Sequence, residues 1–212
     1  MKRSVPTNRT KKIYPLDIQK ILGTRYISHN KIDDKRLLNW DIKKDKEYTT
    51  NPDLNDRLEK KFGTLIGQGY VAPVYIKWVN KFVEYGTFAD ALIKRGEMIC
   101  EYTGILCEDS GDVDNLYLWD YPTYFFKTTP GKKRRKKIKF CIDAEKMGNV
   151  ARSINHTAHK YQNVGIQIVP AQGFWHVIYV AKKDIEKDQQ LLTHYGLEYW
   201  RDRQIVPIAI KP

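Results

Sequence analysis

Hydrophobic and polar positions follow a helical spacing in one stretch of the first third of the chain. Leu54, Leu58 and Phe62 recur every four residues among polar neighbours. Residues at this spacing lie on one face of an α-helix, so the stretch predicts a helix that buries this face. The residues before it are mostly polar. They predict an irregular arm to about Tyr14, followed by short helical pieces.

The ends of this predicted helix carry residues that are typical of helix termini. Asn51 is a favourable N-cap, and Pro52 suits the first helical position because its fixed φ matches a helix. Gly63 and Gly67 are expected to end the helix, since glycine is common at helix C-termini.

The pattern changes to short strands from about residue 74. Residues 74–79, 98–102 and 175–180 are rich in β-branched and aromatic side chains, and glycines and charged turns separate them. Helical spacing is nearly absent from this part of the chain. We therefore expect a mainly β fold of several small sheets and not a parallel α/β core.

These patterns divide the chain into three parts. Residues 1–70 predict a basic N-terminal arm and helical region, residues 71–200 a single domain of short strands, and residues 201–212 a C-terminal tail. The first 50 residues carry 13 Lys or Arg against 6 Asp or Glu, so they hold +7 of the formal net charge of +12.

The net charge favours polyanionic partners such as DNA, RNA, nucleosomes or anionic lipid. Charge alone does not choose among them, and a basic surface that only keeps the protein soluble has the same balance. A six-residue basic run follows Pro130 and Gly131. It is expected to be a nucleic-acid contact or nuclear-import signal, or else a solvated hairpin tip. The run consists of Lys132, Lys133, Arg134, Arg135, Lys136 and Lys137.

Composition argues against several other classes of protein. None of the three cysteines belongs to a C-x-x-C pair, which speaks against a zinc cluster or a disulfide framework. Cys100 and Cys141 lie in strand-like runs, where we expect small buried side chains in a reducing compartment. The chain has no run of about 18 apolar residues that would predict a transmembrane helix. Its charged first residues do not read as a secretory signal.

The most informative segment is residues 148–157, which read Gly-Asn-Val-Ala-Arg-Ser-Ile-Asn-His-Thr. This segment resembles the G-N-x-x-R-F-I-N-H-S segment of SET-domain lysine methyltransferases. Ser153 stands where the family has Phe, and Thr157 where it has Ser. The identical positions are Gly148, Asn149, Arg152, Ile154, Asn155 and His156.

Segments in the expected order on both sides resemble the same family over about residues 74–200. Residues 85–89 look like the end of the glycine-rich K-G-x-G-x-F-A turn, although Glu84 replaces its first Gly. The acidic side chain there either weakens the cofactor site or faces the ammonium group of the methyl donor. Residues 96–104 resemble G-E-x-I-x-E-Y-x-G, residues 142–144 resemble I-D-A, and residues 190–200 resemble E-L-T-[FY]-D-Y-G with its following aromatic pair.

The resemblance implies a SET fold of several small sheets with a pseudoknot, preceded by the small basic helical region. It also implies S-adenosylmethionine as methyl donor, a lysine substrate and no metal. The implied catalytic residues are Tyr195 and Tyr102. Donor-binding residues would be Tyr85, Gly86, Arg152, Asn155, His156 and Trp200. The substrate channel would be lined by Tyr117, Thr193 and Tyr199.

Three departures from the family keep a second hypothesis open. Glu84, Ser153 and Thr193 differ from the family pattern, so the chain is either a protein-lysine methyltransferase or a catalytically silent module that binds chromatin or nucleic acid. If it is an enzyme, the small Thr193 at the position of an aromatic residue predicts a roomier channel and di- or trimethylation.

Within the family, the chain is similar to short bacterial SET proteins of the chlamydial type. The segments that carry this likeness are residues 78–80, 101–106 and 194–196. It implies a histone or a bacterial histone-like protein as substrate, with DNA beside the target lysine contacted by the basic residues. It also implies a bacterial protein that is delivered to a host nucleus or otherwise stays in the cytoplasm. The sequence leaves the oligomeric state open.

Overall fold

The computed structural model describes residues 10–127, 136–204 and 210. The N-terminal part consists of short helices, two strands of two residues each and one longer helix. These elements are η1 (Pro15–Asp17), α1 (Ile18–Leu22), β1 (Arg25–Tyr26), β2 (Lys31–Ile32), α2 (Lys35–Leu38), η2 (Ile42–Lys44), α3 (Lys46–Thr50) and α4 (Pro52–Gly67).

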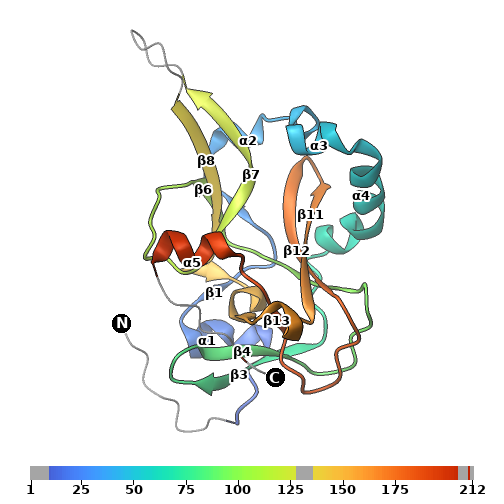
Figure 1. Ribbon diagram of the computed structural model, residues 1–212, viewed down its shortest axis with the longest axis vertical. Helices are drawn as coiled ribbons and strands as arrows, with labels where there is room; N and C mark the ends of the chain where they lie inside the picture. The colour runs from blue at the N-terminus through green and yellow to red at the C-terminus, as the bar shows by residue number, and fades with distance from the viewer. Residues whose placement is uncertain (1–9, 128–135, 205–209, 211–212) are drawn as a thin grey trace.

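Strands dominate the rest of the chain, which confirms the expected mainly β fold (Figure 1). The three strands expected from side-chain composition are present as β3, β5 and β12. The elements are β3 (Val74–Asn80), β4 (Glu84–Ala89), β5 (Met98–Glu101), β6 (Ile105–Glu108), β7 (Leu118–Lys127), β8 (Lys136–Asp143), β9 (Met147–Gly148), η3 (Val150–Ser153), β10 (Asn155–His156), η4 (His159–Tyr161), β11 (Val164–Ala171), β12 (Phe174–Ala181), β13 (Leu192–Thr193) and α5 (Leu197–Arg203).

The strands form several small sheets, as the pattern predicts. The largest has four strands in the order β2-β6-β8-β7, and a second has three in the order β11-β12-β5. Two-stranded pairs are formed by β3 with β4, β1 with β9, and β10 with β13. In the four-stranded sheet, β7 and β8 continue beyond the other strands as a long hairpin (Figure 1). We call these two strands the β7–β8 hairpin.

The N-terminal part is built into these sheets. Strand β1 pairs in parallel with β9, and β2 pairs in parallel with β6, so residues 25–32 add the edges of two sheets. Ile13 forms a further antiparallel bridge with Ile76 of β3. Ile18, Leu22 and other apolar side chains of this part lie in the main hydrophobic core. The region that the sequence sets apart as an arm and helices therefore shares its core with the strands.

A buried carboxylate fixes the N-terminal part to two sheets. Asp45, directly before α3, accepts hydrogen bonds from the indole N–H groups of Trp40 and Trp175, both at 2.8 Å, and from the hydroxyl of Thr123 at 2.6 Å. Trp175 belongs to β12 and Thr123 to β7. Because three donors surround it, the carboxylate is satisfied although it is buried.

The helix predicted after residue 51 is present as α4, but its details differ from the expectation. Leu54 is exposed, while Phe62 and Ile66 are buried against β11, so the apolar face lies nearer the C-terminal end than the spacing suggests. Gly63 does not end the helix, which continues to Gly67. Asn51 precedes the helix, but its side chain accepts no capping hydrogen bond.

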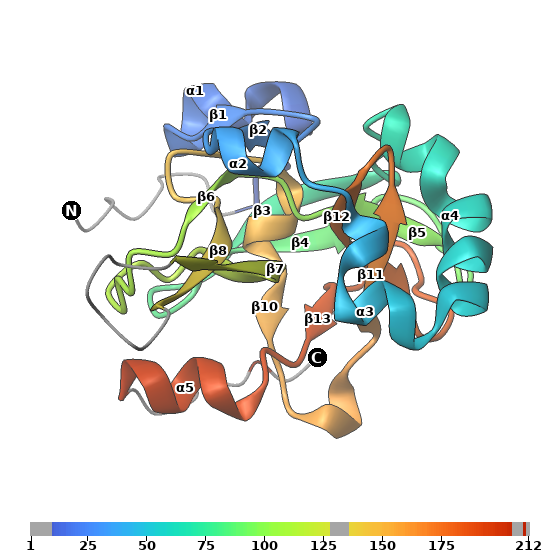
Figure 2. The same cartoon turned by 90° about the horizontal axis from the view of Figure 1, so that it is seen from above.

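Two views establish where the helices lie. Helix α4 packs beside β11 and β5 at one end of the molecule, and α5 lies at the opposite end (Figure 2). The segment with η3 and β10 runs through the middle, between these ends (Figure 2). None of the helices described, in any of the three ranges, is both long and apolar enough to cross a membrane.

Candidate active site

A pocket of about 770 Å³ lies where the ends of several elements meet. Its wall takes residues from the turn after α1, the start of β4, the residue after β5, the start of β7, the segment η3–β10 and helix α5. Aromatic side chains form much of this wall. They are Phe82, Tyr85, Tyr102, Tyr117, Trp119, Tyr179, Tyr195, Tyr199 and Trp200.

The segment that carries the family motif is enclosed by later parts of the chain. In β10, Asn155 and His156 pair in parallel with Leu192 and Thr193 of β13. On the C-terminal side, the backbone N–H of Ile210 donates to the His156 carbonyl at 3.0 Å, and the Thr157 hydroxyl donates to the Ile210 carbonyl at 2.6 Å. The chain after residue 190 therefore folds around the 148–157 segment, as the expected pseudoknot requires.

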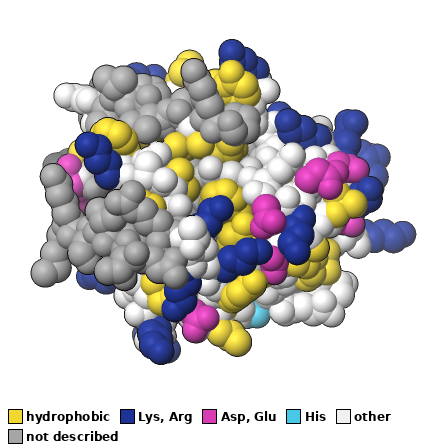
Figure 3. Space-filling view, turned by 90° about the horizontal axis from the view of Figure 1, so that it is seen from below, with side chains coloured by type: hydrophobic (Ala, Val, Ile, Leu, Met, Phe, Trp, Pro, Cys, Tyr) yellow, Lys and Arg dark blue, Asp and Glu magenta, His cyan; other side chains and the backbone are white. Residues whose placement is uncertain are grey.

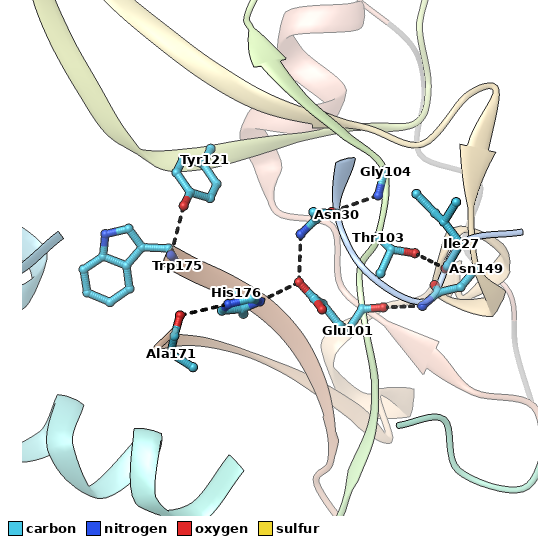
Figure 4. Close-up of polar contacts among 10 residues, drawn as sticks. All are labelled: Ile27, Asn30, Glu101, Thr103, Gly104, Tyr121, Asn149, Ala171, Trp175 and His176. Atoms are coloured by element: carbon cyan, nitrogen blue, oxygen red, sulfur yellow. Dashed lines mark hydrogen bonds and ion pairs between the residues drawn. The ribbon is translucent and has the colours of Figure 1, made fainter. Parts of the chain in front are cut away.

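Tyr102 lies directly after β5. A buried polar network around Glu101, the last residue of β5, holds this strand in place (Figure 4). The carboxylate of Glu101 contacts the side-chain amide of Asn30 and Nδ1 of His176, both at 2.7 Å. The amide of Asn149, within the family motif, donates to the Glu101 carbonyl at 2.8 Å. Because Asn30, Asn149 and His176 come from distant parts of the sequence, the network fixes the position of Tyr102 relative to all three.

The hydroxyl groups of Tyr102 and Tyr195 are arranged alike. Tyr102 donates to the backbone carbonyl of Tyr117 at 2.7 Å, and Tyr195 donates to that of Ile154 at 2.8 Å. Burial raises the pKa of both phenols well above the usual value, so both are neutral at physiological pH. Each hydroxyl proton is used by a carbonyl, which leaves the oxygen lone pairs free to accept a hydrogen bond from a ligand.

Helix α5 closes one side of the pocket through aromatic packing. The Tyr195 ring stacks on Trp200 with 13° between the planes, and Tyr199 meets it edge-on at 4.9 Å between ring centroids. The helix is tied across to the segment before β7, because the hydroxyl of Tyr199 donates to the Leu116 carbonyl at 3.1 Å. Tyr199 and Trp200 therefore close this side of the pocket by packing.

Asn155 and His156 connect β10 to both neighbouring walls. The Asn155 amide donates to the Tyr85 carbonyl at 3.0 Å, and Nδ1 of His156 accepts from the Tyr195 N–H at 3.2 Å. Burial, followed by the nearby His194 and His159, lowers the pKa of His156 to about 4. His156 is therefore neutral at physiological pH, which is the form in which Nδ1 can accept this bond.

Arg152 is on the pocket wall, but its guanidinium is engaged in holding the wall together. It donates to the carbonyl of Ala144 at 2.9 Å, to the hydroxyl of Thr24 at 2.8 Å and to the carbonyl of Glu145 at 3.2 Å. It also lies 3.9 Å from the ring centroid of Tyr117. These contacts join the family motif to the turn after α1.

Two of the residues expected at the site are absent from the pocket wall. Thr193 is fully buried in β13, and its hydroxyl accepts a hydrogen bond from the Gln162 amide at 3.3 Å. Gly86 lies behind the wall, where a Cβ atom would come within 2.8 Å of Val79 and 3.1 Å of the Asn155 amide. Gly86 is thus needed for close packing under the site, whereas Thr193 supports β10 from behind.

Several residues of the pocket wall were not assigned to the site from the sequence, among them Tyr179, Trp119 and Thr24. Tyr179 of β12 and Trp119 of β7 each lie about 6 Å from the Tyr102 ring, at centroid distances of 6.4 and 5.7 Å. Thr24 reaches the pocket from the N-terminal part. Tyr179 has the signal of an aromatic residue in a buried strand, which indicates a core position as readily as a pocket. No local signal marks Thr24, because only the tertiary fold brings it there.

The basic run lies only partly within the described residues. Lys132, Lys133, Arg134 and Arg135 are outside them. Lys136 and Lys137 are exposed at the start of β8, and Lys136 pairs with Lys127 of β7. The ammonium group of Lys137 lies 3.8 Å from the ring centroid of Tyr124. Across the described ranges, no three His, Cys, Asp or Glu side chains gather in a way that could hold a metal ion.

The motif, the pocket and the enclosed β10 segment agree with one family. The model of the SET domain matches residues 84–196, more than half of the chain. The chain belongs to the SET-domain family. The SET domain of this chain thus begins at β4 and ends at Gly196, immediately before α5. Residues 10–83 and α5 extend the domain at its two ends.

Curated relatives of this SET-domain chain are named lysine methyltransferases. Histone-lysine N-methyltransferase Set8 of Drosophila melanogaster is 30% identical over 118 residues, covering 52% of this chain and 16% of that protein. N-lysine methyltransferase KMT5A-A of Danio rerio is 29% identical over 140 residues, covering 63% of this chain and 38% of that protein. The match thus spans well under half the length of these relatives.

A solved structure shows the same fold over most of the chain. The crystal structure of ATXR5 in complex with histone H3.1 mono-methylated on R26 superposes with a TM-score of 0.57 at 19% sequence identity. The superposition covers 85% of both chains. Since it extends well beyond residues 84–196, regions that flank the SET domain also have counterparts in that structure.

The wall residues of this SET domain fit an adenosyl ligand. The indole N–H of Trp200 is buried on the pocket wall and finds no acceptor within the described part of the chain. Adenine and ribose both offer acceptors, and the aromatic faces around Trp200 suit a planar base. The pocket volume also lies in the usual range for cofactor sites, which is roughly 300–1,000 Å³.

Proposed function

We propose that this chain is a protein-lysine methyltransferase that uses S-adenosylmethionine. The observation that carries the proposal is the pair of neutral tyrosine hydroxyls, Tyr102 and Tyr195, on one pocket wall with their protons given to backbone carbonyls. Two oxygen acceptors without a formal charge suit a neutral amine, which must be oriented and not held as an ammonium ion.

The chemistry sets clear demands on the residues around the amine. S-adenosylmethionine supplies an electrophilic methyl group on a sulfonium. The attacking lysine must be neutral, although its free pKa is about 10.4. A channel lined by aromatic side chains disfavours the charged form through desolvation. Holding the amine in line with the methyl group supplies part of the rate enhancement through orientation.

The described residues divide these tasks among them. Tyr102 and Tyr195 would accept hydrogen bonds from the lysine amine, and Tyr117 and Tyr199 would line its channel. The donor would be held by Asn155, His156, Trp200 and the turn at Tyr85. Arg152 acts indirectly in this assignment, because its guanidinium fixes the wall beneath Tyr117.

The test is methyl transfer from labelled S-adenosylmethionine to nucleosomes, free histones and a bacterial basic DNA-binding protein. Tyr195→Phe should lower the rate by about 100-fold or more, since it removes an acceptor at the reacting amine. Tyr161→Phe is the matched control, because Tyr161 is half-buried outside the pocket and should keep its activity. Circular dichroism should show that both variants are folded.

The methyl-transfer assay, together with calorimetry of S-adenosylmethionine binding, separates the enzyme from a silent binding module. Full activity of Tyr195→Phe would reject the role assigned to this hydroxyl. A folded wild-type protein that binds no S-adenosylmethionine in calorimetry and labels none of the three substrates would reject the enzyme. The module that binds chromatin without catalysis would then be the better account.

We further propose that the substrate is a lysine of a histone or another basic protein, and that DNA is contacted at the same time. A protein with a net charge of +12 repels a basic tail, so attraction must come from a polyanion bound beside it. On the face in Figure 3, Lys and Arg side chains are spread among fewer acidic ones. The described end of the β7–β8 hairpin adds Lys127, Lys136 and Lys137.

The expected product is di- or trimethyl-lysine. The support is that position 193 has no aromatic side chain and that Thr193 stays behind the wall, so it takes no room from the channel. Tyr179 and Trp119 then set the limit near Tyr102. Mass spectrometry after exhaustive turnover should show dimethyl or trimethyl product. An end point of monomethyl-lysine alone would contradict this proposal.

A further inference from the structure

Glu84 lies on the pocket wall in a backbone conformation that is unfavourable for its side chain. Its φ is 57°, in the left-handed region that glycine adopts without strain and that Glu rarely enters. It follows a turn in which the Asn80 side chain accepts hydrogen bonds from the N–H groups of Phe82 and Val83, at 2.9 and 3.1 Å. Glycine would close this turn without strain, so the turn does not explain the carboxylate.

Among the described residues, the Glu84 side chain has no partner that would account for its presence. It is half-buried, and it forms no hydrogen bond or ion pair with the residues of the described ranges. Residues with a strained backbone are common at functional sites. There, a side chain without a partner in the protein can interact with a bound ligand. The carboxylate therefore points to a cationic ligand group in the pocket.

The position of Glu84 relates it directly to the donor site. The next residue, Tyr85, is on the wall, and its carbonyl accepts the Asn155 amide at 3.0 Å. Asn155 belongs to β10, which leads through the β13 pairing to Tyr195. Glu84 therefore directly precedes Tyr85, the residue whose carbonyl connects the start of β4 to Asn155 of β10.

We propose that the Glu84 carboxylate binds the ammonium group in the amino-acid part of S-adenosylmethionine; this inference rests on the proposed function. The sulfonium is the other cation of the donor, but its charge disappears during methyl transfer. A carboxylate beside it would stabilise the reactant more than the transition state and slow the reaction. The ammonium keeps its charge throughout, so pairing with it strengthens binding without that penalty.

Calorimetry with three ligands tests the assignment. They are S-adenosylmethionine, S-adenosylhomocysteine, which has the ammonium but no sulfonium, and methylthioadenosine, which has neither. Glu84→Gln should weaken the first two equally, by about 10- to 100-fold, and leave the third unchanged. Glu84→Gly should lose the same affinity but melt at a higher temperature, because it removes the strain as well as the charge. Glu59→Gln, an exposed carboxylate of α4, controls for the change in net charge.

Each outcome decides a different point. Equal affinity of wild type and Glu84→Gln for S-adenosylmethionine would overturn the Glu84 assignment and leave the proposed function standing. Weaker binding of S-adenosylmethionine alone, with a faster turnover, would place the carboxylate at the sulfonium and also overturn it. A wild-type protein that binds none of the three ligands would overturn the proposed function together with this inference.

Discussion

At the residue scale, burial sets the protonation state of the polar side chains around the pocket. The Tyr102 and Tyr195 phenols have raised pKa values, and the His156 imidazole has a lowered one, so all three are held in their neutral forms. A wall of neutral hydrogen-bonding groups is suited to a ligand that brings its own charge. His156 also has a measurable consequence for stability.

Stability should fall as the pH is lowered from about 7 to 5, in part because of His156. Its pKa is about 4 in the folded protein, below the ordinary 6.5, so the unfolded chain binds a proton in this window that the folded protein does not. We expect a loss on the order of 1 kcal/mol from this residue between pH 7 and 5. The measurement is urea unfolding at both pH values.

The variant His156→Asn should show a smaller loss between the same pH values, since its amide does not titrate but can still accept the Tyr195 N–H. His194 has a lowered pKa too, so some pH dependence should remain. His29→Asn, at an exposed position, should behave like wild type. An unchanged pH dependence in His156→Asn would exclude His156 as its source.

Several residues that the motifs assign to the site lie together on the pocket wall. Tyr102, Asn155, His156 and Tyr195 all reach the pocket, because local backbone geometry fixes their spacing within the short motif segments. Thr193 was placed by the same motif but faces the interior. Successive side chains of a strand point to opposite faces, so a shift of one residue reverses the face. Because β13 consists of two residues only, it has no alternating pattern that would show which face Thr193 takes.

At the scale of elements, two glycines have opposite importance for stability. A Cβ atom at Gly104, between β5 and β6, would lie 2.7 Å from the Asp143 carbonyl carbon and overlap its oxygen. At Gly63, in the interior of α4, it would make ordinary contacts at 3.6 Å with Glu59 and 3.8 Å with Ala171. The first site requires glycine, and the second does not.

Gly104→Ala should therefore destabilise the protein by about 1–3 kcal/mol, because backbone atoms must move apart. Gly63→Ala should stabilise it by about 0.5–1 kcal/mol, because alanine is the better helix former. Chemical denaturation of both variants measures the two changes. If the two variants changed stability in the same direction, the packing described at one of the two glycines would be wrong.

Element types were easier to predict than element ends. Alternation and β-branched residues identify β3, β5 and β12, and four-residue spacing identifies α4. The face of α4 was misjudged because Leu54 suits the spacing, yet β11 covers only the later turns, around Phe62 and Ile66. Strands of two residues, such as β1 and β10, have no periodicity at all, so tertiary pairing alone defines them.

At the scale of the whole molecule, the distribution of charge predicts how substrate is bound. If DNA is contacted during catalysis, nucleosomes should be methylated faster than free histones, and the advantage should fall steeply as salt rises. The replacement of Lys136 and Lys137 by Gln should make this salt dependence shallower. The measurement is the initial rate on both substrates over a series of salt concentrations.

The matched control is the replacement of Arg57 and Lys60 by Gln, which removes the same charge from exposed positions on α4. This double variant should keep the salt dependence of wild type. Equal rates on nucleosomes and free histones, with a flat salt profile, would exclude the DNA contact. Equal effects of both double variants would show that only the overall charge matters.

The N-terminal part of the chain is joined to the strands more closely than the domain pattern suggests. The sequence separates residues 1–70 from the strands, because composition changes there. The structure joins them through β1, β2 and the Asp45 network, which are contacts between residues far apart in the sequence. Such contacts leave no local pattern, so they could not be predicted from one sequence.

The pocket wall joins parts of the chain that are far apart in the sequence, since Thr24 and Trp200 both border it and the N–H of Ile210 donates a hydrogen bond to His156. During synthesis, the ribosome makes Thr24 long before Trp200 leaves the exit tunnel. A growing chain can therefore form α4 or the β7–β8 hairpin early, but it cannot bind a ligand in this pocket. The pocket would therefore be completed late, and a chain that stops before Trp200 would lack one of its walls.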